Sequence, residues 1–263
     1  HEKVVSMPHL GASTREAQVN VAVDVAREII RYLDEQPLEN AVNIPRFDLT
    51  LMEQMRPFLH LVNIMGDFVV QLLDTNMNKV TFTYEGNISE YCTTPITVCG
   101  LAALLNRKVE QDVNMVNANL VAETMGIAVE EVKLPESGSF SNMITITIEG
   151  PNEKRVISGT HFEGTPRIVK LRDYQVDFAP EEYMLLLSYQ DRPGMIGKIG
   201  MILGRHEINI GAMHLGRRKK KGEAMVILSL DSPAPSNVVE EIRTATEATF
   251  SKALHIVTAR ESK

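Results

Sequence analysis

The stretch "SYQDRPGMIGKIGMILGRHEINI", residues 188–210, decides the fold of the last third of the chain. It begins at the end of an apolar strand, turns at Asp191-Arg192-Pro193-Gly194, and continues as a helix and a second strand. Around it the order strand, helix, strand, strand, helix, strand predicts a ferredoxin-like βαββαβ domain over 181–263. Its segments are 181–190, 191–207, 208–218, 222–231, 236–247 and 253–259.

The turn at 191–194 is also a candidate ligand site. It brings the backbone N–H groups of Gly194, Met195 and Ile196 to a helix N-terminus, where a carboxylate binds favourably. Asp191 beside it suits an ammonium group, so the pair is suited to a small amino acid. The alternative is a plain helix start in which Asp191 serves only as the N-cap.

In residues 47–178, some segments have apolar residues at helical spacing and others at the alternating spacing of strands, which predicts an α+β domain without internal repeats. Helices are expected over 51–73, 93–106 and 113–127, the last ending at Gly126 as a C-cap. Alternating strands are expected over 79–86, 141–150, 154–162 and 167–178. Asn114, Asn117 and Asn119 are interpreted as helix capping.

The middle segment also carries a cluster of basic residues. On strands, such side chains can converge on a phosphate, while the alternative is a scatter of surface charges. The cluster consists of Lys154, Arg155, His161, Arg167, Lys170 and Arg172.

The first segment, residues 1–46, contains "VVSMPHLGAST" at 4–14. A short strand at 3–7 leads through His9 into a helix, for which Ser13 and Glu16 form a capping box. A histidine at a strand end before a helix lies where open α/β sheets bind ligands, and imidazole exchanges protons near neutral pH. The alternative is a histidine that only hydrogen-bonds within a turn. The helix carries one apolar stripe and ends at Pro37.

Composition excludes several classes of protein. The 263 residues have 44% hydrophobic and 23% charged residues, ordinary values for a globular protein, and no apolar run of about 18 residues. The net charge of −7 disfavours nucleic acid, and the basic run 217–221 is interpreted as a solvated hairpin tip. Cys92 and Cys99, expected on one helix, are too far apart for a disulfide, so reduced thiols and a cytoplasmic location are expected. No Cys/His spacing indicates a metal site.

The stretch "PHLGASTREAQ", residues 8–18, resembles the surroundings of the catalytic histidine in the D-2-hydroxyacid dehydrogenases, and is most similar to the long-form D-3-phosphoglycerate dehydrogenases. That resemblance implies three parts: the last strand and helix of a Rossmann-type nucleotide-binding domain at 1–46, an intervening allosteric substrate-binding domain at 47–178, and an ACT domain at 181–263. It implies NAD as the cofactor of the parent enzyme, His9 as the acid/base, and Leu10, Gly11 and Ala12 beside the nicotinamide. The chain has no G-x-G-x-x-G loop, so we expect a fragment that is inactive by itself.

Residues 187–216 resemble the ligand turn of ACT domains, which in this family binds the inhibitor L-serine between two copies of the domain. The resemblance implies a homo-oligomer in which serine contacts Tyr189, Asp191, the backbone of 194–196 and, from the partner chain, Asn209. For the intervening domain it implies an anion site that includes Arg167, with Lys170 and Arg172 as further candidates.

Two alternatives remain open at this point. One is a non-enzymatic amino-acid sensor built on an ACT module, and the other is a chain of the iron–sulfur L-serine dehydratases, which pair similar domains. Neither needs "PHLGASTREAQ", and the dehydratase also lacks support because the chain has no cysteine cluster.

Overall fold

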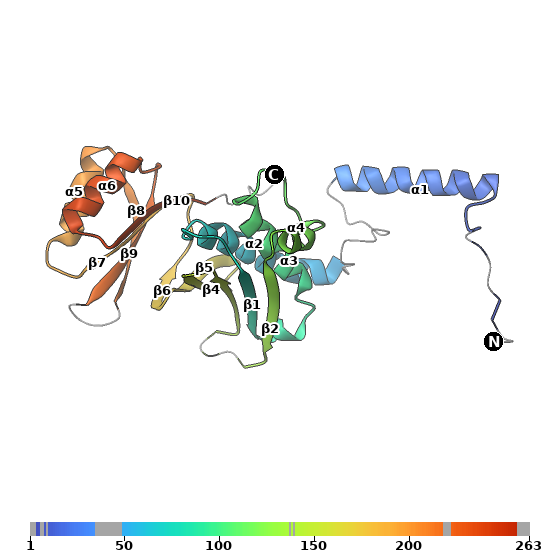
Figure 1. Ribbon diagram of the computed structural model, residues 1–263, viewed down its shortest axis with the longest axis horizontal. Coiled ribbons are helices and arrows are strands. Elements are labelled where there is room, and N and C mark those ends of the chain that lie inside the picture. Colours follow the sequence, from blue (N-terminus) through green and yellow to red (C-terminus); the bar gives the residue numbers. More distant parts are fainter. Residues whose placement is uncertain are drawn as a thin grey trace. The chain divides into compact units, whose positions relative to one another are not determined.

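In the computed structural model, the chain divides into two compact units, residues 1–53 and 54–263 (Figure 1). The structure describes residues 4–5, 8, 10–34, 49–136, 138, 140–217 and 222–256, with only the backbone described for 49–53.

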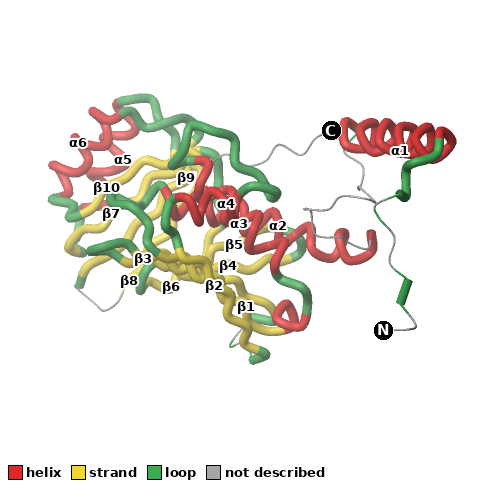
Figure 2. The backbone as a smooth tube through the Cα atoms, turned by 45° about the vertical axis from the view of Figure 1, so that its right-hand side comes forward, coloured by secondary structure: helices red, strands yellow, loops and turns green. Residues whose placement is uncertain are grey.

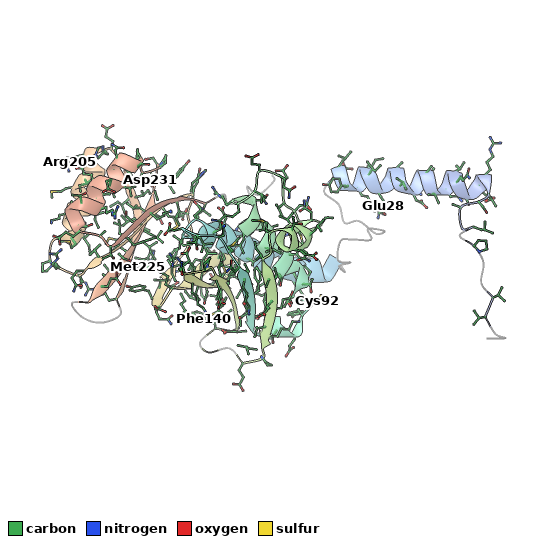
Figure 3. All side chains as sticks on the ribbon, in the orientation of Figure 1. Glu28, Cys92, Phe140, Arg205, Met225 and Asp231 are labelled. Atoms are coloured by element: carbon green, nitrogen blue, oxygen red, sulfur yellow. The ribbon has the colours of Figure 1, made fainter. Side chains whose placement is uncertain are left out.

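The N-terminal unit contains the helix α1 (Arg15–Leu33), which confirms the predicted helix but not its cap. Thr14 is the N-cap, and its side chain accepts from Ala17 N–H, whereas Ser13 donates to the Leu10 carbonyl. None of the helix residues is buried, and the side chains of α1, Glu28 among them, project outward around it (Figure 3). Of the strand expected at 3–7, the structure describes only Val4 and Val5, and neither is in a strand. The predicted apolar stripe is therefore exposed, as Val19, Val23, Ile30 and Leu33 illustrate.

In the described part of the second unit, the first domain is built on a six-stranded sheet of order β2-β1-β3-β4-β5-β6 (Figure 2). Neighbouring strands are antiparallel except β1 and β2, which are parallel. The strands are β1 (Lys79–Gly86), β2 (Ala128–Leu134), β3 (Asn142–Glu149), β4 (Lys154–Phe162), β5 (Thr165–Leu171) and β6 (Tyr174–Phe178).

One face of this sheet is buried, because alternate residues of β1 and β3 are fully enclosed: Val80, Phe82, Tyr84, Ile144, Ile146 and Ile148. The helices α2 (Leu49–Val70) and α3 (Thr94–Asn106) supply most of the other buried apolar side chains, and α4 (Ala118–Thr124) and the 3-10 turn η1 (Asn87–Glu90) complete the domain. The helices α2 and α3 approach closely at Gly66 and Gly100, because a Cβ on Gly66 would lie only 2.8 Å from the Gly100 carbonyl oxygen.

Several details differ from the expectations. β2 was not predicted, and the stretch 167–178 is a hairpin that turns at Arg172 (φ 55°) instead of one continuous alternating run. The helix expected over 113–127 is confined to α4, because Asn114 and Asn117 hydrogen-bond backbone groups in the loop before it. Gly126 does follow the helix with φ 70°, as its predicted C-cap role requires. Cys92 precedes α3, so the two cysteines do not share a helix.

The second domain confirms the ferredoxin-like prediction. Its sheet has the order β10-β7-β9-β8, all antiparallel, and α5 and α6 lie side by side on one face (Figure 1). The strands and helices are β7 (Tyr183–Gln190), α5 (Met195–Arg205), β8 (Ile210–Arg217), β9 (Glu223–Leu230), α6 (Ser236–Thr246) and β10 (Phe250–His255). The loop after Arg217 joins two antiparallel strands, as expected of a hairpin, and its residues 218–221 lie outside the described residues.

Candidate functional site

The region around His9 gives no enclosed site in the part of the chain that the structure describes. His9 itself lies outside the described residues. Leu10, Gly11 and Ala12 are exposed, with Leu10 52% accessible, and residues 10–13 form a turn closed by Ser13 N–H on the Leu10 carbonyl. The contacts of Leu10, Gly11 and Ala12 with a nicotinamide, and the acid/base role of His9, stay predictions.

The turn between β7 and α5 leads into a helix start that no side chain caps. Gly194 is the N-cap with φ 89° and ψ −9°, a left-handed conformation that favours glycine, and no side chain caps α5. Met195 N–H makes only a long contact of 3.4 Å to the Arg192 carbonyl. The expected alternative, Asp191 as N-cap, is therefore wrong, and the first turn of α5 remains able to donate to an anion.

Tyr189 and Asp191 lie next to each other where β7 ends. Tyr189 is 1% exposed, and its buried Oη has no hydrogen-bond partner among the described residues. Burial, with a contribution from the Asp191 charge, raises the pKa of Tyr189. A buried phenol without a partner loses about 1–3 kcal/mol relative to a satisfied one, which makes this position receptive to a polar ligand.

Asp191 has a partner that sequence reasoning missed. Arg217 Nε, at the end of β8, lies 3.1 Å from Asp191 Oδ2, and Asp191 N–H donates to the Gly222 carbonyl at 2.9 Å. The Asp191 side chain is mostly covered, at 19% accessibility, while Arg217 is half exposed. The signal was present in the sequence, because Arg217 begins the basic run that was interpreted only as a hairpin tip.

Asn209 lies just before β8, where its Nδ2 donates to Asp231 Oδ2 at 2.7 Å. Asp231 follows the end of β9 (Figure 3). No hydrogen bond or ion pair between described residues joins Asn209 to Tyr189 or Asp191 within one chain. Asn209 is exposed, so its side chain is accessible to a second molecule.

The basic cluster of the first domain does not converge on one point, although Arg167 and His161 line the same cavity. Arg167 Nε donates to Asp177 Oδ1 at 2.6 Å and lines a cavity of about 780 Å³, together with Phe140, Thr160 and His161. Lys170 lines a separate cavity of about 320 Å³ with Glu85, and the Arg172 guanidinium stands 5.5 Å from the Phe250 ring centroid.

The β-bulge between Ile168 and Lys170 and the turn at Arg172 explain why the cluster separates, because both break the simple alternation of the strand. Of the remaining basic residues, Lys154 pairs with Glu149 and Arg155 with Glu153. Among the described residues of the cluster, Arg167 and His161 thus line the wider cavity and Lys170 the narrower one.

Two negative findings apply to the described residues. They hold no group of three or more histidine, cysteine or acidic side chains arranged to bind a metal ion. In the same residues, no helix is both long and apolar enough to cross a membrane.

Comparison with known proteins defines both domains. Residues 183–246 match the model of the ACT domain, so the ferredoxin-like domain is an ACT domain. Residues 54–172 match the D-3-phosphoglycerate dehydrogenase intervening domain. The chain therefore carries the intervening domain of the D-3-phosphoglycerate dehydrogenases followed by an ACT domain.

Three relatives named D-3-phosphoglycerate dehydrogenase show the extent of the match. The chain is 38% identical to the protein of Synechocystis sp. over 91% of this chain and 44% of the relative. It is 35% identical to that of Bacillus subtilis and 34% to that of Methanocaldococcus jannaschii, each over 92% of this chain and 46% of the relative. The chain thus spans about half the length of the curated relatives it matches, and their shared name favours this family over the sensor and the dehydratase.

Proposed function

We propose that this chain is the regulatory C-terminal portion of an NAD-dependent D-3-phosphoglycerate dehydrogenase, with L-serine as feedback effector of its ACT domain. The parent enzyme would oxidise 3-phosphoglycerate to 3-phosphohydroxypyruvate, the first step of L-serine biosynthesis, in the cytoplasm. The intervening domain followed by an ACT domain, matched over most of the chain by three proteins of that name, supports the proposal. We assign residues 1–46 to the nucleotide-binding domain, 47–178 to the intervening domain and 181–263 to the ACT domain.

The single observation that carries the effector site is the pair Tyr189 and Asp191 beside the uncapped start of α5. In the proposed complex the serine carboxylate accepts backbone N–H groups of residues 194–196, where the helix dipole favours negative charge. The ammonium group binds Asp191 and displaces Arg217 from it, while the Tyr189 hydroxyl gains the partner it lacks. Asn209 of a second copy would complete the site.

The ACT domain also offers a surface for pairing two chains. Ile196 and Met201 on α5 and Met213 on the edge strand β8 are exposed, with Met201 67% accessible. Exposed apolar side chains next to an edge strand are typical of protein interfaces. We infer a homo-oligomer formed through the ACT domains, in which each serine site takes residues from two chains.

Isothermal titration of the 263-residue chain tests the effector site. Serine should bind the wild-type chain, and Asp191→Ala should weaken binding about five- to 150-fold, because an ammonium left without its carboxylate loses about 1–3 kcal/mol. Glu240→Ala removes an exposed carboxylate of the same domain that pairs with Arg243 on α6 and, as a control, should retain most of the affinity. Glycine and inorganic phosphate serve as comparison ligands.

Two results would contradict this assignment. Serine heat that is unchanged in Asp191→Ala would place the amino-acid site elsewhere. Regulation would instead be assigned to the cavity of the intervening domain if serine produced no heat of binding and if phosphate bound in a way that Arg167→Ala abolishes.

A further inference from the structure

A second cavity of the intervening domain has a chemistry unlike that of the Arg167 cavity. It has a volume of about 260 Å³ and lies between the first described turns of α2, the turn η1 and the ends of β3 and β4. Met55, Phe58, Ile88 and Ile96 give it apolar walls, and none of the described residues that line it is Asp, Glu, Lys or Arg. An anion entering it would lose hydration without gaining a charged partner.

His161 supplies one polar group at this cavity. Its ring packs on Phe58, with 4.6 Å between ring centroids, and its Nε2 is buried without a hydrogen-bond partner among the described residues. Burial lowers the pKa of His161, so the ring is neutral at pH 7. A neutral imidazole nitrogen that lacks a partner is open to a hydrogen bond from a ligand.

Asn142 supplies the second polar group, and its orientation is fixed. Ile88 N–H donates to Asn142 Oδ1 at 2.7 Å, and because a backbone N–H only donates, the amide must present its oxygen there. The Asn142 carbonyl accepts from Thr160 Oγ1 at 2.7 Å, which holds the residue to β4. The Asn142 Nδ2 group is therefore left as a donor at the cavity wall.

We propose that this cavity binds a small uncharged molecule that combines an apolar ring or chain with a hydroxyl or carboxamide group. The ligand oxygen accepts from Asn142 Nδ2, its O–H or N–H group pairs with His161 Nε2, and its apolar part packs on Met55, Phe58 and Ile96. The volume exceeds the roughly 30 Å³ share of one water molecule several times, so a single water would leave most of the apolar wall uncovered.

The site would be distinct from the Arg167 cavity, although Asn142 and His161 border both. The wider cavity contains Arg167, Glu163 and Asp177 and suits charged ligands. The smaller one excludes charge, and its occupancy does not depend on the identity of the parent enzyme or on serine binding.

Nuclear magnetic resonance of the 263-residue chain with ¹³C-labelled histidine rings tests the proposal. Benzamide and phenol serve as uncharged probes, benzoate as the charged match to benzamide, and benzene as the apolar match to phenol. Saturable shifts of the His161 ring signals by benzamide and phenol, with affinities about tenfold weaker for benzoate and benzene, are the expected result. The His161 signals are assigned from their disappearance in His161→Phe.

Three variants locate the binding by ligand-detected saturation transfer. Asn142→Asp keeps an oxygen for Ile88 N–H but removes the Nδ2 donor, and His161→Phe keeps a ring against Phe58; each should weaken benzamide binding about tenfold or more. Arg167→Ala should leave it unchanged. Unshifted His161 signals at saturating probe, equal binding of benzoate, or full affinity in both folded Asn142→Asp and His161→Phe would overturn the proposal and leave the cavity to water.

Discussion

Arg107 binds Asp67 through two hydrogen bonds and at the same time reaches the ACT domain. Its Nε lies 2.6 Å from Asp67 Oδ1 and its Nη2 3.1 Å from Oδ2, while Nη2 also donates to the His255 carbonyl at 2.6 Å. Gln71 holds the same backbone position, accepting from His255 N–H and donating to its carbonyl. The end of β10 is thereby fixed to α2 and to the residue that ends α3.

Arg107→Ala should therefore destabilise the chain and loosen the contact between the two domains. Asp67 is 7% exposed, and a buried carboxylate deprived of its arginine partner costs up to about 3–5 kcal/mol. Urea unfolding followed by circular dichroism measures the loss. Arg205→Ala breaks an exposed pair with Glu241 and should cost less than about 1 kcal/mol. Equal effects of the two substitutions would mean that Arg107 contributes no more than a surface charge.

A second contact between the domains makes stability sensitive to alkaline pH. Tyr174 Oη donates to Glu223 Oε2 at 2.8 Å, and burial, together with this hydrogen bond, raises the pKa of Tyr174 to about 12. Below pH 10 the phenol is protonated in both the folded and the unfolded chain. Between about pH 10 and 12 only the folded chain keeps the proton, so stability falls as pH rises, by up to about 1.4 kcal/mol per unit.

Tyr174→Phe should make the pH dependence of unfolding shallower between pH 10 and 12. Comparing the unfolding free energy of the variant and the wild type at pH 8, 10 and 11.5 isolates the slope from the loss of the hydrogen bond itself. Tyr84, whose pKa burial also raises, remains in both proteins and keeps a common background. Parallel curves for the two proteins would show that Tyr174 titrates normally.

The sequence predicts those parts of the fold that alternation and helical spacing record. The strand at 79–86, the paired strands 142–149 and 154–162, and the order of the ACT domain all follow from apolar residues on one face. β2 escapes because the stretch 128–134, "AVEEVKL", is exposed almost throughout, so its extended form comes from backbone pairing with β1 and not from burial. Because the side chains of β2 are exposed on both faces of the strand, its sequence does not show a regular alternation of apolar and polar residues.

The candidate site likewise has some features that the local sequence predicts and others that it does not. The turn at Gly194 and the position of Asp191 come from local sequence, because a turn and a helix start are short-range features. The ion pair between Asp191 and Arg217 and the pairing of Arg167 with Asp177 depend on neighbouring strands. The pairing of Asn142 with Ile88 depends on the register of β1 and β3, in which Gly86 lies opposite Asn142. The register of two strands cannot be inferred from a single sequence without the structure.

Glycine at the crossing of α2 and α3 gives a prediction about packing. A Cβ on Gly100 would lie 2.6 Å from Val62 Cγ2 and 2.7 Å from Phe82 Cε1, so Gly100→Ala should destabilise the chain by about 1–3 kcal/mol. Gly204 in α5 has open space around it, and Gly204→Ala should be neutral or stabilise by up to about 1 kcal/mol. Thermal unfolding of both variants, at low protein concentration, compares them. A stable Gly100→Ala would show that the two helices can move apart.

The proposed catalytic role of His9 is tested in a complete enzyme that carries these 263 residues. His9→Ala should lower turnover of 3-phosphoglycerate about 10²- to 10⁴-fold, the usual contribution of a positioned acid/base, with unfolding unchanged. The 263-residue chain alone should form no NADH, since it has no G-x-G-x-x-G loop. Turnover within a few-fold of the wild type would reduce His9 to a turn residue, and NADH formation by the chain alone would contradict the division of roles.

If the serine site is shared between two chains, a mixture of two variants should regain binding, which a site within one chain would not allow. Asp191→Ala and Asn209→Ala should each weaken serine binding, because the proposed site takes Asp191 from one protomer and Asn209 from its partner. Mixing the two variants, with dissociation and reassociation, produces some dimers in which one site has both residues intact. The second serine site of that dimer lacks both residues.

Random pairing makes about half of the dimers mixed, so about a quarter of the wild-type number of sites should regain full affinity. Titration of the equimolar mixture with serine measures that number, and sedimentation confirms that the dimers have exchanged. Each variant incubated alone in the same way is the control and should recover nothing. If the mixture also recovered nothing, Asp191 and Asn209 would serve sites within single chains, and the exposed Asn209 would have no part in binding the effector across the interface.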